Sequence, residues 1–460
     1  MAKKLHIKTY GCQMNVYDSE RIAEVLAPIG FVLSDTADDA DMVILNTCHI
    51  REKAADKVYS QLGRLRDQKA LKEQKGERMI LGVTGCVAQA EGREVQRRAP
   101  YVDMVFGPQT YHRLPEMVAR TMREHGHILD TDFPEDSKFD ALPQTRTVEG
   151  ATAFLSVQEG CDKFCTYCVV PYTRGAEYSR PTSQVMSEAQ VLIEGGAKEI
   201  TLLGQNVNAY HGLDHAGMSW NLARLIKELA ALEGLERIRY ITSYPAEMND
   251  DLIRAHGDIE KLMPYLHLPI QAGSDNMLKA MNRQHTVAEY KETVKKLRAG
   301  VPGLALSSDF IVGFPGETDA DFEQTMSLVQ EMQFIQTYSF KYSARPGTPA
   351  ALLESQPEYH VPESVKAERL ARLQNLLNQN TLAFNMAAVG KTYPVLLDRV
   401  GKSAGQLIGR TPYMQAVVVE APNDCLNSIQ NVTITQAGPN SLQGLIVSRG
   451  NAGLSQRAHA

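Results

Sequence analysis

The chain has 460 residues, 43% of them hydrophobic and 22% charged, which is enough apolar material for the cores of roughly two to four domains. This composition excludes an intrinsically disordered protein. Lys and Arg number 48 against 54 Asp and Glu, and the net charge of −6 does not by itself suggest a nucleic-acid binder, so any such binding must come from a local basic patch.

The first predicted domain, residues 3–120, alternates strand-like and helix-like segments. Its apolar runs have the composition of buried strands and lie at 5–11, 41–47 and 79–85, with helical segments at 19–30 and 52–68. Strand, helix and strand at this spacing predict a parallel α/β sheet.

A cysteine stands at or directly after the end of each of these three runs: Cys12 in TYGC, Cys48 in NTC and Cys86 in TGC. Ligands of open α/β sheets bind outside the carboxyl ends of the strands, where the fold would bring the three thiols together. We therefore predict that these cysteines hold a three-thiolate iron–sulfur cluster. The alternative is ordinary core packing, because free cysteine is among the most buried residue types.

Residues 125–146 are rich in Asp and Pro and predict a linker. After it, the run GCDKFCTYC places Cys161, Cys165 and Cys168 directly behind a strand-like segment. This CxxxCxxC spacing supplies three thiolates where a cubane iron–sulfur cluster has four irons, so one iron keeps an open position. An open metal position is where a substrate or cofactor binds, which favours a catalytic cluster over one that only stores electrons.

Two other uses of the CxxxCxxC motif fit the sequence poorly. A structural zinc site needs four N or S ligands, and the nearest candidate beyond Cys168 is His211, which has no ligand spacing around it. A disulfide framework belongs to small, cysteine-dense secreted chains, whereas this chain has 7 cysteines in 460 residues. The seventh, Cys425, has no partner at ligand spacing and is expected to be structural.

The second predicted domain, residues 147–377, repeats strand-like and helical segments. Strand-like runs lie at 152–159, 199–204, 237–243, 265–270, 304–313 and 335–342, with helices between them, for example at 182–196, 222–234 and 287–300. Six βα units predict a partial (β/α)6 barrel of the TIM type, whose chemistry lies on loops at the carboxyl ends of the strands. The cysteine loop and the motifs LGQN, TSYP, LPIQAGS and VGFPGET all fall there, although each motif taken alone is ordinary turn chemistry.

The third predicted domain, residues 380–448, follows a long amphipathic helix at 365–385. Its short strand-like runs with Gly and Pro turns predict a small β-barrel. From about residue 380 to the end of the chain, six basic residues outnumber three acidic ones, a local charge of +3. The basic residues are Lys391, Arg399, Lys402, Arg410, Arg449 and Arg457, and the acidic ones are Asp398, Glu420 and Asp424. Such an excess is consistent with phosphate contacts, or equally with a solvated surface.

Longer motifs occur in all three domains: TYGCQMN, NTCHIREKA, VTGCVAQ, GCDKFCTYCVVPYTRG, LLGQNVNAY, LHLPIQAGS, SSDFIVGFPGET and YSARPGTPAA. Together they resemble those of the radical S-adenosylmethionine (SAM) methylthiotransferases over nearly the whole chain, and the third domain is similar to the TRAM RNA-binding module. Residues Tyr167, Val169, Val170, Tyr172 and Thr173 follow the branch of this family that modifies tRNA, rather than the sister branch that modifies an aspartate of a ribosomal protein.

This resemblance implies two [4Fe–4S] clusters and SAM as cofactors. The cluster on Cys161, Cys165 and Cys168 would bind SAM and generate a 5′-deoxyadenosyl radical, and the cluster on Cys12, Cys48 and Cys86 would supply sulfur, methylated by a second SAM. The resemblance also implies SAM contacts at Tyr167, Gln205, Asn206, Ser243, Gln271, Asp309 and Gly313.

The implied reaction is methylthiolation at C2 of N6-dimethylallyladenosine, position 37 of the tRNA anticodon loop, giving 2-methylthio-N6-dimethylallyladenosine. A radical route suits an unactivated aromatic C–H bond, and a single-stranded loop can present its base to a pocket. The partners would be a tRNA carrying that nucleoside, an electron donor such as flavodoxin or ferredoxin, and a sulfur source.

Two alternatives to this function stay open: the sister activity on a ribosomal-protein aspartate, and a non-catalytic two-cluster protein that transfers electrons or binds RNA. Closed four-cysteine ligation would be expected of an electron-transfer protein. With no run of eighteen apolar residues and no apolar segment behind its N-terminal lysines, the chain is expected to have neither a membrane span nor a signal peptide and to be cytoplasmic.

Overall fold

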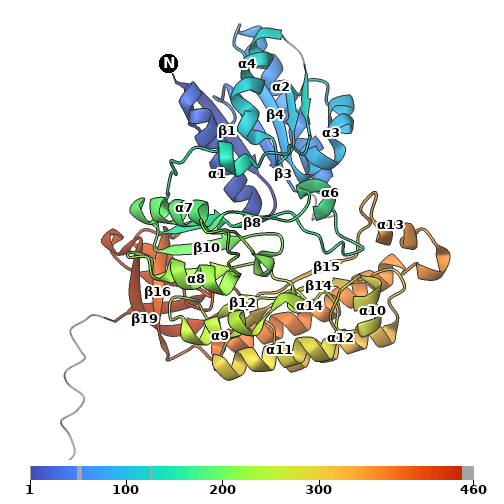
Figure 1. The fold of residues 1–460 in the computed structure, drawn as a ribbon, viewed down its shortest axis with the longest axis vertical. Helices are drawn as coiled ribbons and strands as arrows, with labels where there is room; N and C mark the ends of the chain where they lie inside the picture. The colour runs from blue at the N-terminus through green and yellow to red at the C-terminus, as the bar shows by residue number, and fades with distance from the viewer. Residues whose placement is uncertain (1, 49–53, 125–126, 448–460) are drawn as a thin grey trace, which may run out of the picture.

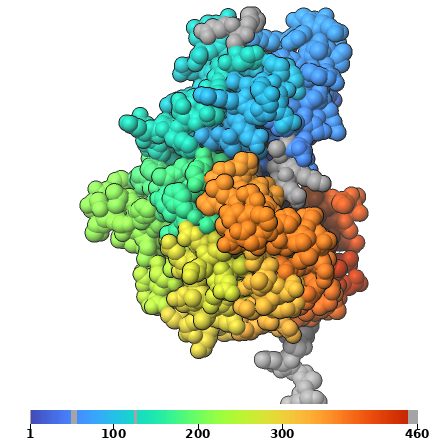
Figure 2. Space-filling view, turned by 90° about the vertical axis from the view of Figure 1, so that its right-hand side faces the viewer, coloured from blue at the N-terminus to red at the C-terminus, as the bar shows by residue number. Residues whose placement is uncertain are grey.

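The computed structural model describes residues 2–48, 54–124 and 127–447, which form an N-terminal α/β domain, a central open barrel and a C-terminal closed barrel (Figure 1). The N-terminal domain stands on one end of the central barrel in both views of the molecule (Figures 1 and 2).

The N-terminal domain is a parallel six-stranded sheet in the order β2-β1-β3-β4-β5-β6. Its strands are β1 (Lys3–Thr9), β2 (Phe31–Leu33), β3 (Met42–Thr47), β4 (Ile80–Gly85), β5 (Met104–Phe106) and β6 (Ile128–Asp130). Its helices are α1 (Gln13–Leu26), α2 (Ala54–Gln74), α3 (Cys86–Arg98) and α4 (Leu114–Glu124). Because β3 and β4 are buried along their whole length, their apolar runs were visible in the sequence.

The segment 125–146, predicted to be a linker, contains the last strand of this sheet and the short helix α5 (Lys138–Ala141). β6 was not predicted from the sequence, because a strand of only three residues, like β2 and β5, is too short to show periodicity.

The strands of the central domain form three paired groups: β7 (Thr152–Ser156), β10 (Glu199–Leu203) and β11 (Arg237–Tyr240); β12 (Tyr265–His267) and β13 (Ala305–Ser307); and β14 (Asp309–Val312) and β15 (Tyr338–Lys341). Single bridges between Ile238 and Leu262 and between Gln271 and Phe310 continue the pairing from group to group. In the described residues no pairing joins β15 to β7, so the barrel is open, as a partial (β/α)6 barrel should be.

The outer helices of the central barrel include α7 (Thr182–Glu194), α8 (Leu222–Ala230), α9 (Asp250–Asp258), α11 (Val287–Gly300) and α12 (Asp319–Met332).

The run 304–313, predicted as one strand, is divided at Ser308 into β13 and β14, which pair with different neighbours. The Ser308 hydroxyl accepts a hydrogen bond from the Ile270 N–H at 3.0 Å, which fixes the division point.

The C-terminal domain is a closed barrel of β16 (Thr392–Val400), β17 (Gln406–Arg410), β18 (Ala416–Glu420), β20 (Leu442–Ile446) and β19 (Ser428–Ala437), reached through the long helix α14 (Glu363–Met386). The sequence did not predict β17. Gly409 lies in this strand where the backbone of β16 approaches so closely that a Cβ atom would come within 2.3 Å of the Leu396 carbonyl oxygen.

Two buried arginines of β11 hold the C-terminal barrel against the central one. Arg239 donates to the carbonyl oxygens of Thr411 and Pro412 at 3.1 and 2.8 Å, and Arg237 donates to that of Arg410 at 3.1 Å. The charges of these arginines are balanced from β10, where Glu199 lies 3.0 Å from Arg239 and is itself buried.

Of the helices in the described ranges, none combines the length and apolarity needed to cross a membrane.

We predict that Glu199→Gln lowers the free energy of unfolding by about 3 kcal/mol, because it leaves two buried guanidinium groups without their counter-charge. Urea unfolding measures this loss. The matched control is Glu236→Gln, whose side chain is 43% exposed beside Lys198 and should contribute less than about 1 kcal/mol. Equal effects of the two substitutions would contradict the role of Glu199.

Candidate active site

The cysteines of the CxxxCxxC motif lie on the loop between β8 (Gln158–Glu159) and the short helix α6 (Val170–Arg174), at the carboxyl end of the first barrel strands. Backbone hydrogen bonds fix this loop to distant segments: Thr166 donates to Met281 at 3.1 Å and accepts from Ala350 at 3.0 Å. The loop is therefore positioned by the whole barrel rather than by its own turns.

Gly160 opens the loop with a φ of +75°, and a Cβ atom there would lie 1.9 Å from the Ala176 carbonyl oxygen. Only glycine fits this position. Its N–H donates to Gln205 Oε1 at 2.6 Å, which ties the start of the cysteine loop to the loop after β10.

Arg283 is the cation next to this set of thiols. It donates to Cys165 Sγ at 3.6 Å and stacks on the ring of Tyr244, with its guanidinium carbon 4.3 Å from the ring centroid. Burial raises the pKa of Cys161 to about 11 and that of Cys168 to about 12, so metal binding at these thiols displaces protons. Sequence reasoning missed Arg283, because nothing local connects it to a cysteine more than a hundred residues away.

The other three cysteines meet at the carboxyl edge of the N-terminal sheet. Cys12 caps the start of α1, Cys86 is the first residue of α3, and Cys48 follows β3. The pKa of Cys12 is lowered to about 6, chiefly by a hydrogen bond with Cys48. Burial opposes this shift, whereas the positive charge of Arg174 also lowers the pKa. Burial raises the pKa of Cys86.

Each of the two sets offers three thiol sulfurs, the donors that hold iron–sulfur clusters. In the described ranges, no three His, Cys, Asp or Glu side chains are arranged to hold one metal ion. A cubane takes one thiolate at each iron, so its ligands need not converge on a common point. Each set offers three thiols on backbone that the fold holds fixed, together with an arginine beside them.

Of the predicted SAM contacts, Tyr167 lies in the cysteine loop itself, Asp309 begins β14, and the other five follow barrel strands. Asn206 donates to Glu247 at 2.7 Å, and Glu247 in turn pairs with Lys163 of the cysteine loop. The Oδ1 of Asn206 and the Oγ of Ser243 are buried, and among the described residues neither has a hydrogen-bond partner. Such atoms can accept or donate to a bound polar ligand.

The remaining predicted contacts lie elsewhere in the barrel. Gln271, with a φ of +81°, bonds through its backbone to Asp309 and Ile311 at the start of β14. Gly313 faces α14, where a Cβ atom would lie 2.3 Å from Lys366 Cγ, so that its missing side chain makes room for this lysine. Among these residues, Gln205 bonds directly to the start of the cysteine loop and Asn206 is linked to it through Glu247.

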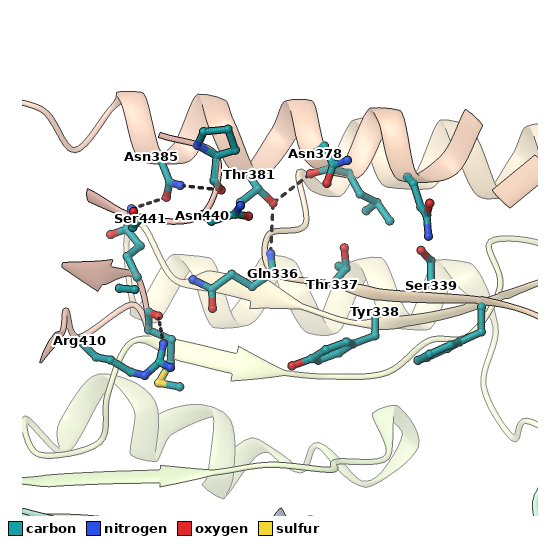
Figure 3. Close-up of a pocket in the computed structure, with 17 residues that line it drawn as sticks. Gln336, Thr337, Tyr338, Ser339, Asn378, Thr381, Asn385, Arg410, Asn440 and Ser441 are labelled. Carbon is teal, nitrogen blue, oxygen red and sulfur yellow. Dashed lines mark hydrogen bonds between the residues drawn. The ribbon is translucent and has the colours of Figure 1, made fainter. Parts of the chain in front are cut away.

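A polar cavity of about 460 Å³ lies between the central and C-terminal barrels (Figure 3). Its lining comes from the segment entering β15, from α14 and from the closed barrel, and it includes Gln336, Tyr338, Asn378, Asn385, Arg410 and Asn440. Amides and hydroxyls predominate, with one arginine and no carboxylate among the lining residues. Tyr338 connects this cavity to the barrel interior, because its ring packs edge-on against His267 at 6.4 Å.

Three family models match the chain: "Uncharacterized protein family UPF0004" at residues 4–107, "Radical SAM superfamily" at 155–329 and "TRAM domain" at 387–447. The fold resembles the radical SAM methyltransferase TsrM from Kitasatospora setae, with a TM-score of 0.55 and 12% identity over 76% of this chain and 77% of that one. It also resembles the cobalamin-dependent SAM radical enzyme OxsB, with a TM-score of 0.52 and 12% identity over 82% of this chain and 56% of that one.

These comparisons confirm the predicted fold: a parallel sheet domain, a radical SAM barrel and a five-stranded barrel at the TRAM region. They also confirm the predicted cofactors. A radical SAM domain uses a [4Fe–4S] cluster and SAM, and a second cluster is typical of this domain combination.

We predict that Gly11→Ala removes about half of the roughly eight irons expected per reconstituted chain, because a Cβ atom there would lie 2.2 Å from Cys48 Cβ. Anaerobic reconstitution followed by iron counting measures this. Gly30→Ala is the control: Gly30 has a φ of +90° against +105° for Gly11, but no atom lies within 4 Å of its added Cβ. Equal iron loss in both variants would show that backbone strain, and not the displacement of Cys48, is responsible.

Proposed function

We propose that this chain, which has the domain architecture of radical SAM methylthiotransferases, methylthiolates C2 of N6-dimethylallyladenosine at position 37 of the tRNA anticodon loop. The C2–H bond would break, and its hydrogen atom would pass to a 5′-deoxyadenosyl radical formed from SAM. The C2–S bond would form to a methylated sulfur that leaves the N-terminal cluster, and that cluster would take up the remaining electron. The methyl group on this sulfur would come from a second SAM, which becomes S-adenosylhomocysteine.

One observation carries this proposal: two three-cysteine sites adjoin each other across the joint between the N-terminal and central domains. Helix α6 begins two residues after Cys168, and its last residue, Arg174, lies beside Cys12 and Cys86. A radical generator and a sulfur donor must act on the same carbon atom, so the two functions require neighbouring sites. A single-cluster enzyme would not need this adjacency.

The chain's own residues would bind and orient the cofactors. When bound at Cys161, Cys165 and Cys168, a [4Fe–4S] cluster supplies the electron for reductive cleavage of SAM. The unpartnered polar atoms of Asn206 and Ser243, with Gln205 between the two loops, are placed to hold polar groups of SAM close to these cysteines. Tyr167, Gln271, Asp309 and Gly313 stay in the proposal as further contacts.

RNA would reach the site from the C-terminal barrel, because a TRAM domain suggests RNA binding. Lys391, Arg399 and Lys402 are exposed on this barrel, and Arg410 lines the cavity at its junction with the core. Arg449 and Arg457, also counted in the predicted basic patch, lie outside the described residues. Exposed cations contact phosphates, and the amide-rich cavity suits the edges of unpaired bases.

The reaction needs two further partners. Radical SAM enzymes require a reductant, and we propose a small electron carrier such as flavodoxin or ferredoxin; a separate sulfur source must restore the atom lost at each turnover. Among the described residues no two cysteines are joined by a disulfide, which fits a reducing compartment, and we place the protein in the cytoplasm.

Reconstituted protein, a strong reductant, SAM and tRNA carrying N6-dimethylallyladenosine provide the direct test, with mass spectrometry of the nucleosides after digestion. We expect 2-methylthio-N6-dimethylallyladenosine in the digest. Its absence, together with modification of an aspartate when ribosomal protein is supplied instead, would replace the tRNA assignment by the sister activity. SAM left uncleaved under all conditions would indicate a non-catalytic protein.

We predict that Cys86→Ala cleaves SAM reductively but does not methylthiolate, whereas Cys165→Ala loses both activities. The reason is that the two residues belong to different three-cysteine sets. Chromatography of 5′-deoxyadenosine measures cleavage, and mass spectrometry measures the product. Normal methylthiolation by Cys86→Ala would exclude the sulfur-donor role. Cys425→Ala, on the C-terminal barrel, is the matched control and should keep both activities.

We predict that Tyr338→Ala weakens tRNA binding at least fivefold, because base stacking on an aromatic ring contributes about 1–3 kcal/mol. The Tyr338 side chain is 54% exposed at the mouth of the polar cavity. Fluorescence anisotropy with a labelled anticodon stem-loop measures the dissociation constant. Tyr359→Ala, on another face of the core and 38% exposed, is the control; equal effects of the two would remove the cavity from the RNA path.

A further inference from the structure

Arg174, the last residue of α6, is a buried arginine to which neither the sequence motifs nor the proposed chemistry assigns a role. Arg174 is only 3% exposed. It belongs to the central domain by its place in the sequence, but its guanidinium group reaches into the N-terminal domain. A buried arginine is costly unless its donors are satisfied and its charge is balanced. The groups around it therefore indicate what it does.

Three groups hold the guanidinium in place from two domains. It donates to Glu159 Oε1 at 2.6 Å, in the strand before the cysteine loop, and to Asn15 Oδ1 at 3.0 Å, on the first turn of α1. Asp18 Oδ2, one turn further along α1, lies 2.7 Å away. Arg174 is thus clamped between the strand that leads to Cys161 and the helix that starts at Cys12.

The carboxylates that hold Arg174 have a second cation of their own. Lys138 Nζ lies 2.7 Å from Glu159 and 3.7 Å from Asp18, and it is as deeply buried as they are. Two cations and two carboxylates balance within this group. Lys138 therefore shares the neutralisation of Glu159 and Asp18 with Arg174, whose charge also acts on the thiols next to it.

Those thiols are Cys12 and Cys86 of the N-terminal set. The charge of Arg174 acts on both, and the side chains of Arg174 and Thr173 are within hydrogen-bonding reach of Cys86. α6 packs against α3, the helix that Cys86 begins. The last turn of α6 therefore contacts one three-cysteine set.

The first turn of α6 contacts the other set. The Val170 N–H donates to Cys168 Sγ at 3.5 Å, and Tyr172 and Thr173 donate to the Val169 carbonyl oxygen at 3.0 Å. A five-residue helix rises only about 7 Å. About one and a half helical turns therefore separate the Val170 N–H, which contacts Cys168, from the Arg174 side chain, which contacts Cys86.

We propose that Arg174 is a positioning residue for the cluster held by Cys12, Cys48 and Cys86: its guanidinium holds these ligands in place, offsets the negative charge of their thiolates and fixes their separation from Cys168. This inference rests on the proposed function in assuming that these cysteines hold a cluster. Lysine would not replace it fully, because only the planar guanidinium has five donors to reach both carboxylates, the amide and the thiol at once.

The test uses the full chain with Cys161, Cys165 and Cys168 all replaced by Ala, so that iron and spectra report on the N-terminal set alone. In this background we compare Arg174→Gln, Arg174→Lys and Arg180→Gln. Arg180 is the matched control: it is 4% exposed at the same domain joint, pairs with Glu188 at 2.8 Å, and leaves Glu188 its partner Arg146 when removed.

For Arg174→Gln we expect at least a twofold loss from the roughly four irons of a full cluster. The midpoint potential of the remaining cluster, followed by electron paramagnetic resonance, should become more negative, because a cation that favours the reduced form is gone. Arg174→Lys should recover the potential more than the iron content. Arg180→Gln should retain both values of the parent.

Thermal unfolding of the iron-free chains separates stability from cluster binding. If Arg174→Gln and Arg180→Gln lose stability equally but only the former loses iron, the positioning role stands. Equal iron content and potential in these two variants would overturn it. These readouts are independent of the tRNA assay, so a chain that binds the cluster through Arg174 but modifies another substrate would refute the proposed function and leave this inference intact.

Discussion

A buried group of four charges at the joint between the N-terminal and central domains underlies the rest of the structure. Arg174 and Lys138 face Asp18 and Glu159, and all four residues are at most 3% exposed. Such a group is weak evidence for stability, since burying charge costs about as much as pairing returns, but it specifies geometry strictly. Here it fixes the strand before one cysteine set against the helix after the other.

Around this group, further buried ion pairs extend the same joint along α1. Arg146 lies 3.0 Å from Glu24 of α1, and Glu188 of α7 accepts a hydrogen bond from the Tyr17 hydroxyl of α1 at 3.3 Å. The two domains are therefore joined by charges with defined directions as well as by apolar packing, in which Leu203, Phe154 and Ile241 of the central domain contact the N-terminal core. Chemistry that passes a sulfur atom between two sites requires such fixed separation, because small displacements of reacting groups reduce rates steeply.

The candidate site was partly predictable from sequence, and the reasons differ by residue. Cys12, Cys48 and Cys86 were predictable because each follows a strand, and strand ends meet at one edge of a parallel sheet. The other three cysteines were predictable from their CxxxCxxC spacing on one loop. Arg283 and Arg174 were not, because their contacts with Cys165 and Cys86 join positions far apart in the chain. Gly313 carried a family motif, yet its Cα faces Lys366 of α14, a helix whose placement no local pattern indicates.

The sequence by itself determined the thiol chemistry, the strand that precedes each cysteine and the order of the three domains, because these depend on local spacing and on alternation of apolar segments. Tertiary structure alone decided that the two cysteine sets adjoin, that α6 touches both, and that a polar cavity lies between the core and the closed barrel. Those features arise where segments distant in the chain meet. Hydrophobic periodicity shows only which face of a helix or strand is buried, and it does not specify which other segment packs against that face.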